Sequence, residues 1–108
     1  MGYLEFGASM KPVILKLARD DLREIHERLS EFGADPPKKF RKSFEKFCVQ
    51  VARAPYIYSQ YVHNSEYRRA VIEYDYLVFY KVEEPTGRVK VFRVLHGKRD
   101  IAPLLNDD

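Results

Sequence analysis

The hydrophobic pattern of the chain changes its period once, near Tyr67, and this change limits the folds that the chain can adopt. Before Tyr67, apolar residues recur at the three- and four-residue steps of amphipathic helices. After it, runs rich in valine and aromatic residues alternate as strands do, with turn residues between them. A chain of 108 residues has the length of one hydrophobic core. The pattern therefore predicts an α+β fold with helices and strands segregated along the chain.

A strand and a helix are predicted first. The segment PVILKL alternates apolar residues at period two and predicts a short strand at 13–17. A stripe of apolar residues at helical spacing, Leu22, Ile25, Leu29 and Phe32, follows and predicts a helix at 19–32. Asp20 and Asp21 would lie in its first turn, where the helix dipole favours anions, and Gly33 would end it.

A second helix is predicted at 36–53, with Asp35 as its candidate N-cap and Pro36 at its first position. It follows the first helix so closely that the two are expected to pack as an antiparallel hairpin. Cys48 lies on its apolar face and is expected to be a core thiol. The other face is basic, which suits nucleic acid or an acidic protein, and suits a solvated helix face equally. Its charges are six cations, Lys38, Lys39, Arg41, Lys42, Lys46 and Arg53, and one anion, Glu45.

The last part of the chain predicts a three-stranded antiparallel meander over 67–96, after a connection whose tyrosines are expected to pack rather than to bind. Both faces of its last two strands are largely apolar. The helical hairpin can cover one face, which leaves the other for a partner or for the C-terminal tail. The residues expected in or near the core are Leu22, Ile25, Leu29, Phe40, Phe44, Phe47, Val51, Val78, Tyr80, Val91 and Val94.

Several functional classes are excluded by what the sequence lacks. It contains no phosphate-binding glycine loop, no HExxH, no GxSxG and a single cysteine, so no metal site and no cofactor are expected. It contains no apolar run of the length that a membrane span requires. We expect a cytoplasmic protein with one domain at 10–108 and a flexible leader at 1–9.

The candidate functional residues are cations and one histidine near strand ends. If neighbouring strands align, several of them would converge on one edge of the sheet and hold a phosphate or a carboxylate. The alternative is that they are ordinary strand-end charges. The candidates are Arg68, Arg69, Arg93, His96, Lys98 and Arg99.

The stretch from Tyr67 to Leu105, with YLVFYKV, a short hairpin and VFRVLHGKRDIAPLL, resembles the ParE/RelE superfamily of bacterial toxins from toxin-antitoxin modules. The order of the upstream elements fits as well, so the similarity extends over residues 10 to 105. The resemblance implies a β-α-α-β-β-β order, with a helical hairpin packed on a small twisted antiparallel sheet. That architecture agrees with the one that the periodicities predict.

The resemblance implies one of two activities. ParE-like members inhibit DNA gyrase, whereas RelE-like members are ribosome-dependent endoribonucleases that cut messenger RNA. Both are neutralised by a cognate antitoxin, here expected to be acidic and partly disordered, and the toxin-antitoxin complex is expected on operator DNA through the antitoxin. An inactive relic of a toxin and a small RNA-binding module remain as alternatives.

The nuclease positions of RelE-like members decide between the two activities. Cutting RNA through the 2′-hydroxyl needs a base, cations and an acid. If this chain were a nuclease, Arg68, His96 and Arg99 would be its candidates. The other nuclease positions carry aliphatic residues, so a ParE-like gyrase inhibitor that acts by binding is favoured. The five carried-over positions are Arg68, Ala70, Leu77, Arg99 and Leu105.

Overall fold

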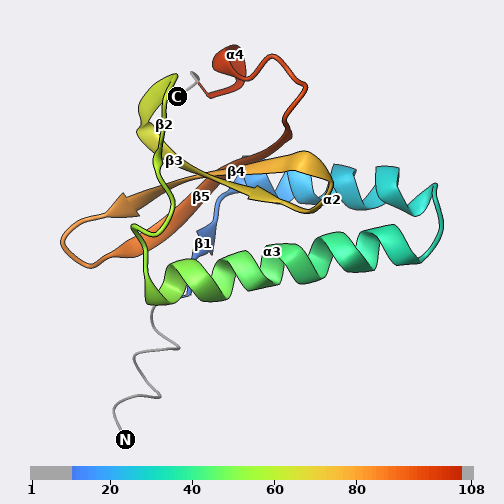
Figure 1. Cartoon of the computed structure of the whole chain (residues 1–108), viewed down its shortest axis with the longest axis horizontal. Helices are drawn as coiled ribbons and strands as arrows, with labels where there is room; N and C mark the ends of the chain where they lie inside the picture. The colour runs from blue at the N-terminus through green and yellow to red at the C-terminus, as the bar shows by residue number, and fades with distance from the viewer. Residues whose placement is uncertain (1–10, 106–108) are drawn as a thin grey trace, which may run out of the picture.

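The computed structural model describes residues 11–105, so the predicted leader lies outside the described residues. A five-stranded sheet carries two long helices on one face and a short helix on the other (Figure 1). The predicted α+β class and the helical hairpin are confirmed. The elements are β1 (Val13–Ile14), α2 (Lys16–Ser30), α3 (Asp35–Arg53), β2 (Gln60–Tyr61), β3 (Asn64–Ile72), the 3-10 turn η1 (Glu73–Asp75), β4 (Tyr76–Glu83), β5 (Arg88–His96) and α4 (Ala102–Leu105).

The strands follow the order β1-β5-β4-β3-β2 across the sheet. Strands β3, β4 and β5 form the predicted antiparallel meander, and β2 adds two residues to it from the connection that follows α3. Strand β1 instead runs parallel to β5, with Val13 opposite Lys90. The sheet is therefore mixed rather than wholly antiparallel. Parallel neighbours need a long connection, which the helical hairpin and the meander together supply.

The first strand is shorter than predicted, because the helix begins three residues earlier. The N–H of Leu15 still donates to the carbonyl of Val91 (3.0 Å), but the next backbone bond, from Arg19 to the Leu15 carbonyl (2.9 Å), is already helical. The apolar stripe of α2 extends back to Ala18, which is fully buried. Burying that stripe outweighs a period-two pattern only five residues long.

The ends of α2 correct two further expectations. Asp20 and Asp21 lie beyond the first turn, so neither caps the helix dipole as predicted. Asp21 is buried instead, with a role described below. The helix ends at Ser30, and Phe32, expected on its apolar stripe, lies past the end with 73% of its surface exposed.

The larger core lies between the hairpin and the sheet. All the predicted core residues are in it: Leu22 and Phe44 are half-buried, and the others are buried. Phe47 is at its centre, with ring contacts to Phe44, Tyr58 and Tyr80. Burying aromatic rings in these edge-to-face and stacked arrangements is a main source of stability in a domain of this size.

The smaller core lies on the opposite face of the sheet. Phe79 and Leu95 are fully buried there beneath Ile101 and Leu105 of the C-terminal segment. The hydroxyl of Tyr67 donates to the carbonyl of Leu105 (3.2 Å) and anchors that segment. Of the two covers expected for this face, the C-terminal segment is therefore present.

Candidate functional site

A tight turn at the end of β5, residues 96–99, presents the cations Lys98 and Arg99. We call it the HGKR turn after its sequence. The N–H of Gly97 donates to the carbonyl of Asp75 (2.9 Å), and a Cβ at Gly97 would lie 3.3 Å from that oxygen. His96 closes the turn, since its Nδ1 accepts from the N–H of Lys98 (3.1 Å) and its carbonyl accepts from the N–H of Arg99 (3.0 Å). Because Nδ1 is an acceptor, Nε2 of neutral His96 carries the proton. Lys98 and Arg99 are exposed at the tip.

The turn between β3 and β4 is strained and supports the HGKR turn. Tyr74 and Asp75 have φ values of 64° and 62°, in the left-handed region that non-glycine residues avoid. The N–H of Glu73 donates to Ser43 Oγ of α3 (3.0 Å), which fixes the start of this turn. Such strain concentrates at functional sites. The sequence marked these residues as a turn, but nothing in it indicated their conformation.

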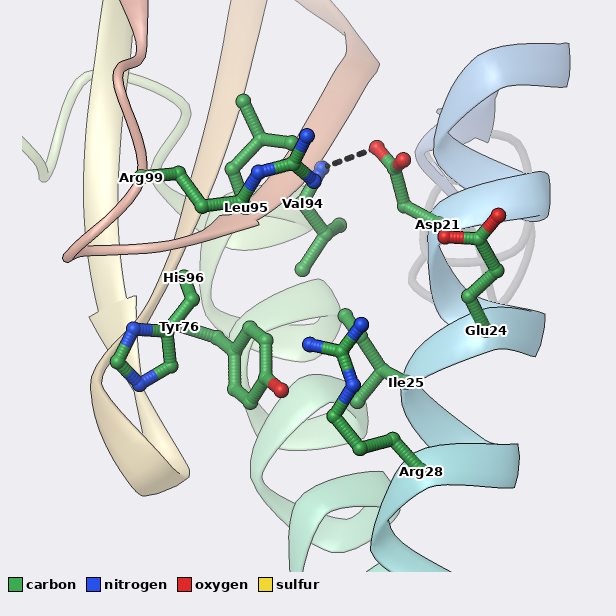
Figure 2. Close-up of a pocket in the computed structure, with 9 residues that line it drawn as sticks. All are labelled: Asp21, Glu24, Ile25, Arg28, Tyr76, Val94, Leu95, His96 and Arg99. Carbon is green, nitrogen blue, oxygen red and sulfur yellow. Dashed lines mark hydrogen bonds between the residues drawn. The ribbon is translucent and has the colours of Figure 1, made fainter.

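A small pocket lies between α2 and the end of β5 (Figure 2). Arg28 points from α2 toward Tyr76, and Arg99 lies on the other side of the pocket. The ring of His96 packs edge-on against Tyr76, with 5.0 Å between ring centroids. Glu24 and Asp21 are the acidic residues of the pocket, and the Asp21 carboxylate is paired with Arg93. The arrangement suits binding of an anionic group.

An apolar hollow adjoins the pocket, and the two share Tyr76 and His96. Leu29, Pro36 and Tyr74 line it together with the exposed ring of Phe32. Sequence reasoning missed Arg28 and Phe32 as site residues. The exposed Phe32 could have been found only from the end of α2, which the pattern placed two residues too late.

Arg93 belongs to the structural framework. Its Nε and one terminal nitrogen donate to the carboxylate of Asp21 (2.8 and 2.9 Å), and its other terminal nitrogen donates to the carbonyl of Leu104 (3.2 Å). Asp21 also accepts the N–H of Val94 (2.9 Å; Figure 2). Strand β1 ends before it reaches Val94, so the Asp21 carboxylate accepts the Val94 N–H in place of a neighbouring strand.

Arg68 and Arg69 do not join the residues after β5. Strand β4 lies between β3 and β5, and Arg68 is opposite Tyr80 whereas His96 is opposite Tyr76. Four residues of a strand separate these positions by about 13 Å along the sheet. Of the six candidates, His96, Lys98 and Arg99 therefore lie together, whereas Arg68 and Arg69 lie elsewhere on the sheet.

The two arginines of β3 have separate surroundings. Arg68 donates to the carbonyl of Tyr58 (2.8 Å), and its guanidinium lies over the ring of Tyr56 at 4.9 Å from the centroid. Arg69 is exposed and lines a hollow with Ile57 and Val71.

The positions that match nuclease groups in RelE-like toxins are largely buried. Ala70 lies in the core beneath the helices, whereas Leu77 and Leu105 lie in the core on the opposite face. These three positions therefore do not surround one substrate site.

Residues 11–105 contain neither a candidate metal cluster nor a membrane-spanning helix. No group of three or more His, Cys, Asp or Glu side chains in that range could hold a metal ion. No helix in the same range is both long enough and apolar enough to cross a bilayer.

The chain matches a known protein family. A protein-family model described as the ParE toxin of the type II toxin-antitoxin system, parDE, matches residues 13–101. A search of curated proteins finds no similar sequence. The matched range begins at β1 and ends at Ile101, so it includes both helices, the whole meander and the HGKR turn.

Proposed function

The chain belongs to the ParE toxin family of type II toxin-antitoxin systems, and from that membership we propose that it arrests bacterial growth by inhibiting DNA gyrase. In this proposal the toxin acts in the cytoplasm, by binding rather than by catalysis. A cognate antitoxin releases the arrest, and the complex of the two binds operator DNA through the antitoxin.

The observation that best supports a binding inhibitor is the chemistry of the nuclease positions. An aliphatic side chain can neither transfer a proton nor stabilise a charged phosphorane. Ala70 and Leu105 are moreover buried, on opposite faces of the sheet. A RelE-like ribonuclease that cuts messenger RNA on the ribosome stays the alternative, with His96 and Arg99 as its remaining candidates.

We assign the contact with gyrase to the end of the molecule that carries the HGKR turn. Lys98 and Arg99 are exposed there, beside Arg28 and the exposed ring of Phe32. Phe32 lines the hollow that adjoins the pocket of Arg28 and Arg99, and aromatic and arginine side chains often dominate binding energy in protein interfaces. His96 holds the turn, and Arg93 connects β5 to α2 and α4.

We assign the antitoxin to the opposite edge of the sheet, beside β2. Ile57, Val62 and Val71 expose 54%, 82% and 55% of their surfaces there. The N–H of Arg69 donates toward β2, to the carbonyl of Ser59 (3.2 Å). Backbone groups alternate in direction along a strand, so the N–H and C=O of Val71 point to the same side as those of Arg69. Strand β2 ends before it could pair with them. A disordered segment can add a strand at such an edge and bury the apolar side chains.

The antitoxin surface is tested with a matched pair of substitutions. Val71→Asp places a charge at the proposed contact, whereas Val49→Asp places one on α3 at a similarly exposed valine (53%). Co-purification with the product of the adjacent small open reading frame should be weakened at least about tenfold by Val71→Asp alone. Equal weakening by both variants would show that the antitoxin binds elsewhere.

The activity is tested by inducing the chain in a bacterial culture. Growth should stop, and the arrested cells should contain broken DNA with intact messenger RNA. The variant Lys98→Ala/Arg99→Ala should relieve the arrest. The control Lys16→Ala/Lys90→Ala, which removes the same charge from two ion-paired lysines, should not. Cleaved messenger RNA without DNA damage would favour the ribonuclease instead.

A further inference from the structure

A row of cations runs along the outward face of α3. Lys38, Lys42 and Lys46 follow one another at four-residue steps, so they lie on one side of the helix at intervals of about 6 Å. Lys39 and Arg41 flank the row, and all five residues are exposed. Figure 1 shows α3 along the lower side of the molecule, with the sheet between it and α4.

The row does not serve the stability of the helix. Like charges four residues apart repel each other. Lys38 and Lys39, at the start of α3, also oppose the helix dipole. Within residues 11–105, none of the five forms an ion pair, whereas Lys16, Lys81 and Lys90 each contact a carboxylate. A row that costs helix stability and finds no internal partner indicates an external one.

The composition of the row indicates the chemistry of that partner. Tight protein interfaces are centred on large apolar or aromatic anchors. From Lys38 to Lys46 no large hydrophobic side chain is exposed. One exposed hydrophobic side chain, Val49 (53% exposed), follows Lys46 by three residues on α3, and the larger exposed ring of Phe32 lies away from the row. A regular row of lysines with one small apolar residue at its end is suited to the evenly spaced charges of a polyanion.

We propose that the outward face of α3 binds the phosphate backbone of duplex DNA without sequence preference. The surface follows from the structure alone. The choice of DNA rests on the proposed function, because a gyrase inhibitor meets its target on DNA. The contact would hold the toxin on the duplex near the enzyme and would leave the HGKR turn free for it.

The test measures binding of the purified chain, without gyrase or antitoxin, to a fluorescent duplex of about 20 base pairs. The salt concentration is raised from about 50 to about 200 mM. Affinity should fall steeply, because each phosphate contact releases a counterion. Lys38→Gln/Lys42→Gln/Lys46→Gln should reduce the slope of log K against log salt by about three, close to one per cation removed.

The matched control is Lys16→Gln/Lys81→Gln/Lys90→Gln, which removes the same charge from ion-paired lysines elsewhere. Its salt slope should stay within about one unit of the wild-type slope. Glutamine has nearly the helix propensity of lysine, and the α3 variant relieves the repulsion between neighbouring lysines. Its melting temperature should therefore be equal to or higher than that of the wild type.

Three results would overturn the proposal. The first is no binding of the wild type at the lowest salt, and the second is equal salt slopes for the α3 variant and the wild type. The third is tighter binding of an RNA duplex of the same length than of DNA. If the α3 variant loses antitoxin affinity while its DNA affinity is unchanged, the face binds the acidic protein instead. An α3 variant that no longer binds DNA but still inhibits gyrase in solution would leave the proposed function unaffected.

Discussion

At the scale of single residues, Asp21 ties three elements together. It lies on α2, forms a two-point ion pair with Arg93 of β5 and accepts the N–H of Val94. Through Arg93 it also reaches the carbonyl of Leu104 in α4. The pair is buried, with 8% of the Asp21 side chain and 15% of the Arg93 side chain exposed. Buried pairs are costly to break, because the remaining charge has no partner and no water.

Removing the carboxylate should therefore destabilise the fold severely. Asp21→Ala is expected to cost about 3–5 kcal/mol of unfolding free energy. The double variant Asp21→Ala/Arg93→Met, which leaves no buried charge, should recover part of that loss. Asp20→Ala, which breaks only exposed pairs, is the control and should have a small effect. Denaturant unfolding measures all three, and equal midpoints for Asp21→Ala and Asp20→Ala would refute the role of Asp21.

Two buried acids predict loss of stability in alkali. Burial raises the pKa of the Cys48 thiol from 9.0 to about 11, with a smaller contribution from the charge of Glu45. Burial likewise raises the pKa of Tyr80 from 10.0 to about 12. Both groups ionise first in the unfolded chain, so their neutral forms favour the folded state below pH 9. That stability is lost from about pH 9 to 11 for Cys48 and from about pH 10 to 12 for Tyr80.

The unfolding free energy should therefore fall across this range when it is measured by urea titration at increasing pH. Cys48→Ala should lower the stability at neutral pH and flatten the fall between about pH 9 and 11. An equally steep fall in wild type and variant would exclude Cys48 as its source.

At the scale of elements, the sequence predicted the helices and strands whose apolar pattern repeats over several helical turns or several strand residues. Helices α2 and α3 and the meander each bury a long periodic stripe, so local pattern and tertiary packing agree. Strand β2 has two residues and α4 has four, too few for any period to be visible. Their structure depends on contacts made elsewhere, such as the Tyr67 bond to Leu105.

The different burial of the aromatic residues of α3 predicts different losses of unfolding free energy when each is replaced by alanine. Phe47 is 1% exposed and is surrounded by other rings, so Phe47→Ala should cost about 3–5 kcal/mol. Phe44 is only half-buried, so Phe44→Ala should cost less than Phe47→Ala. Val49→Ala, on the exposed face, should be nearly neutral. Thermal melts of the three variants give the order, and a larger loss for Phe44→Ala would mean that the helix face is wrongly assigned.

At the scale of the whole molecule, the sequence predicted only that part of the candidate site whose residues are close together in the sequence. His96, Lys98 and Arg99 lie in one turn, so their proximity follows from the sequence. Arg28 joins them through the packing of α2 against β5, which no local pattern shows. Arg68 and Arg69 lie apart from them, because β4 lies between β3 and β5, and that order of strands is not visible in the sequence.

The three contacts that we propose lie on three separate surfaces of the fold. The HGKR turn lies at one end of the sheet, the apolar edge beside β2 at the opposite edge from β1, and the lysine row on the outward face of α3. An antitoxin bound beside β2 would not need to cover the HGKR turn directly. The antitoxin would then neutralise the toxin by steric hindrance of gyrase binding or through a second contact with the toxin.

The most direct test of the central claim is a supercoiling assay with purified DNA gyrase, relaxed plasmid and this chain. We predict that the wild type stops supercoiling. We also predict that Lys98→Ala/Arg99→Ala raises the inhibitory concentration at least about tenfold, because two charge-assisted contacts are lost. The control Lys16→Ala/Lys90→Ala should inhibit like the wild type. The account is contradicted if gyrase is unaffected while translating ribosomes given this chain cut their message in the A-site codon, in a reaction that Arg99→Ala abolishes.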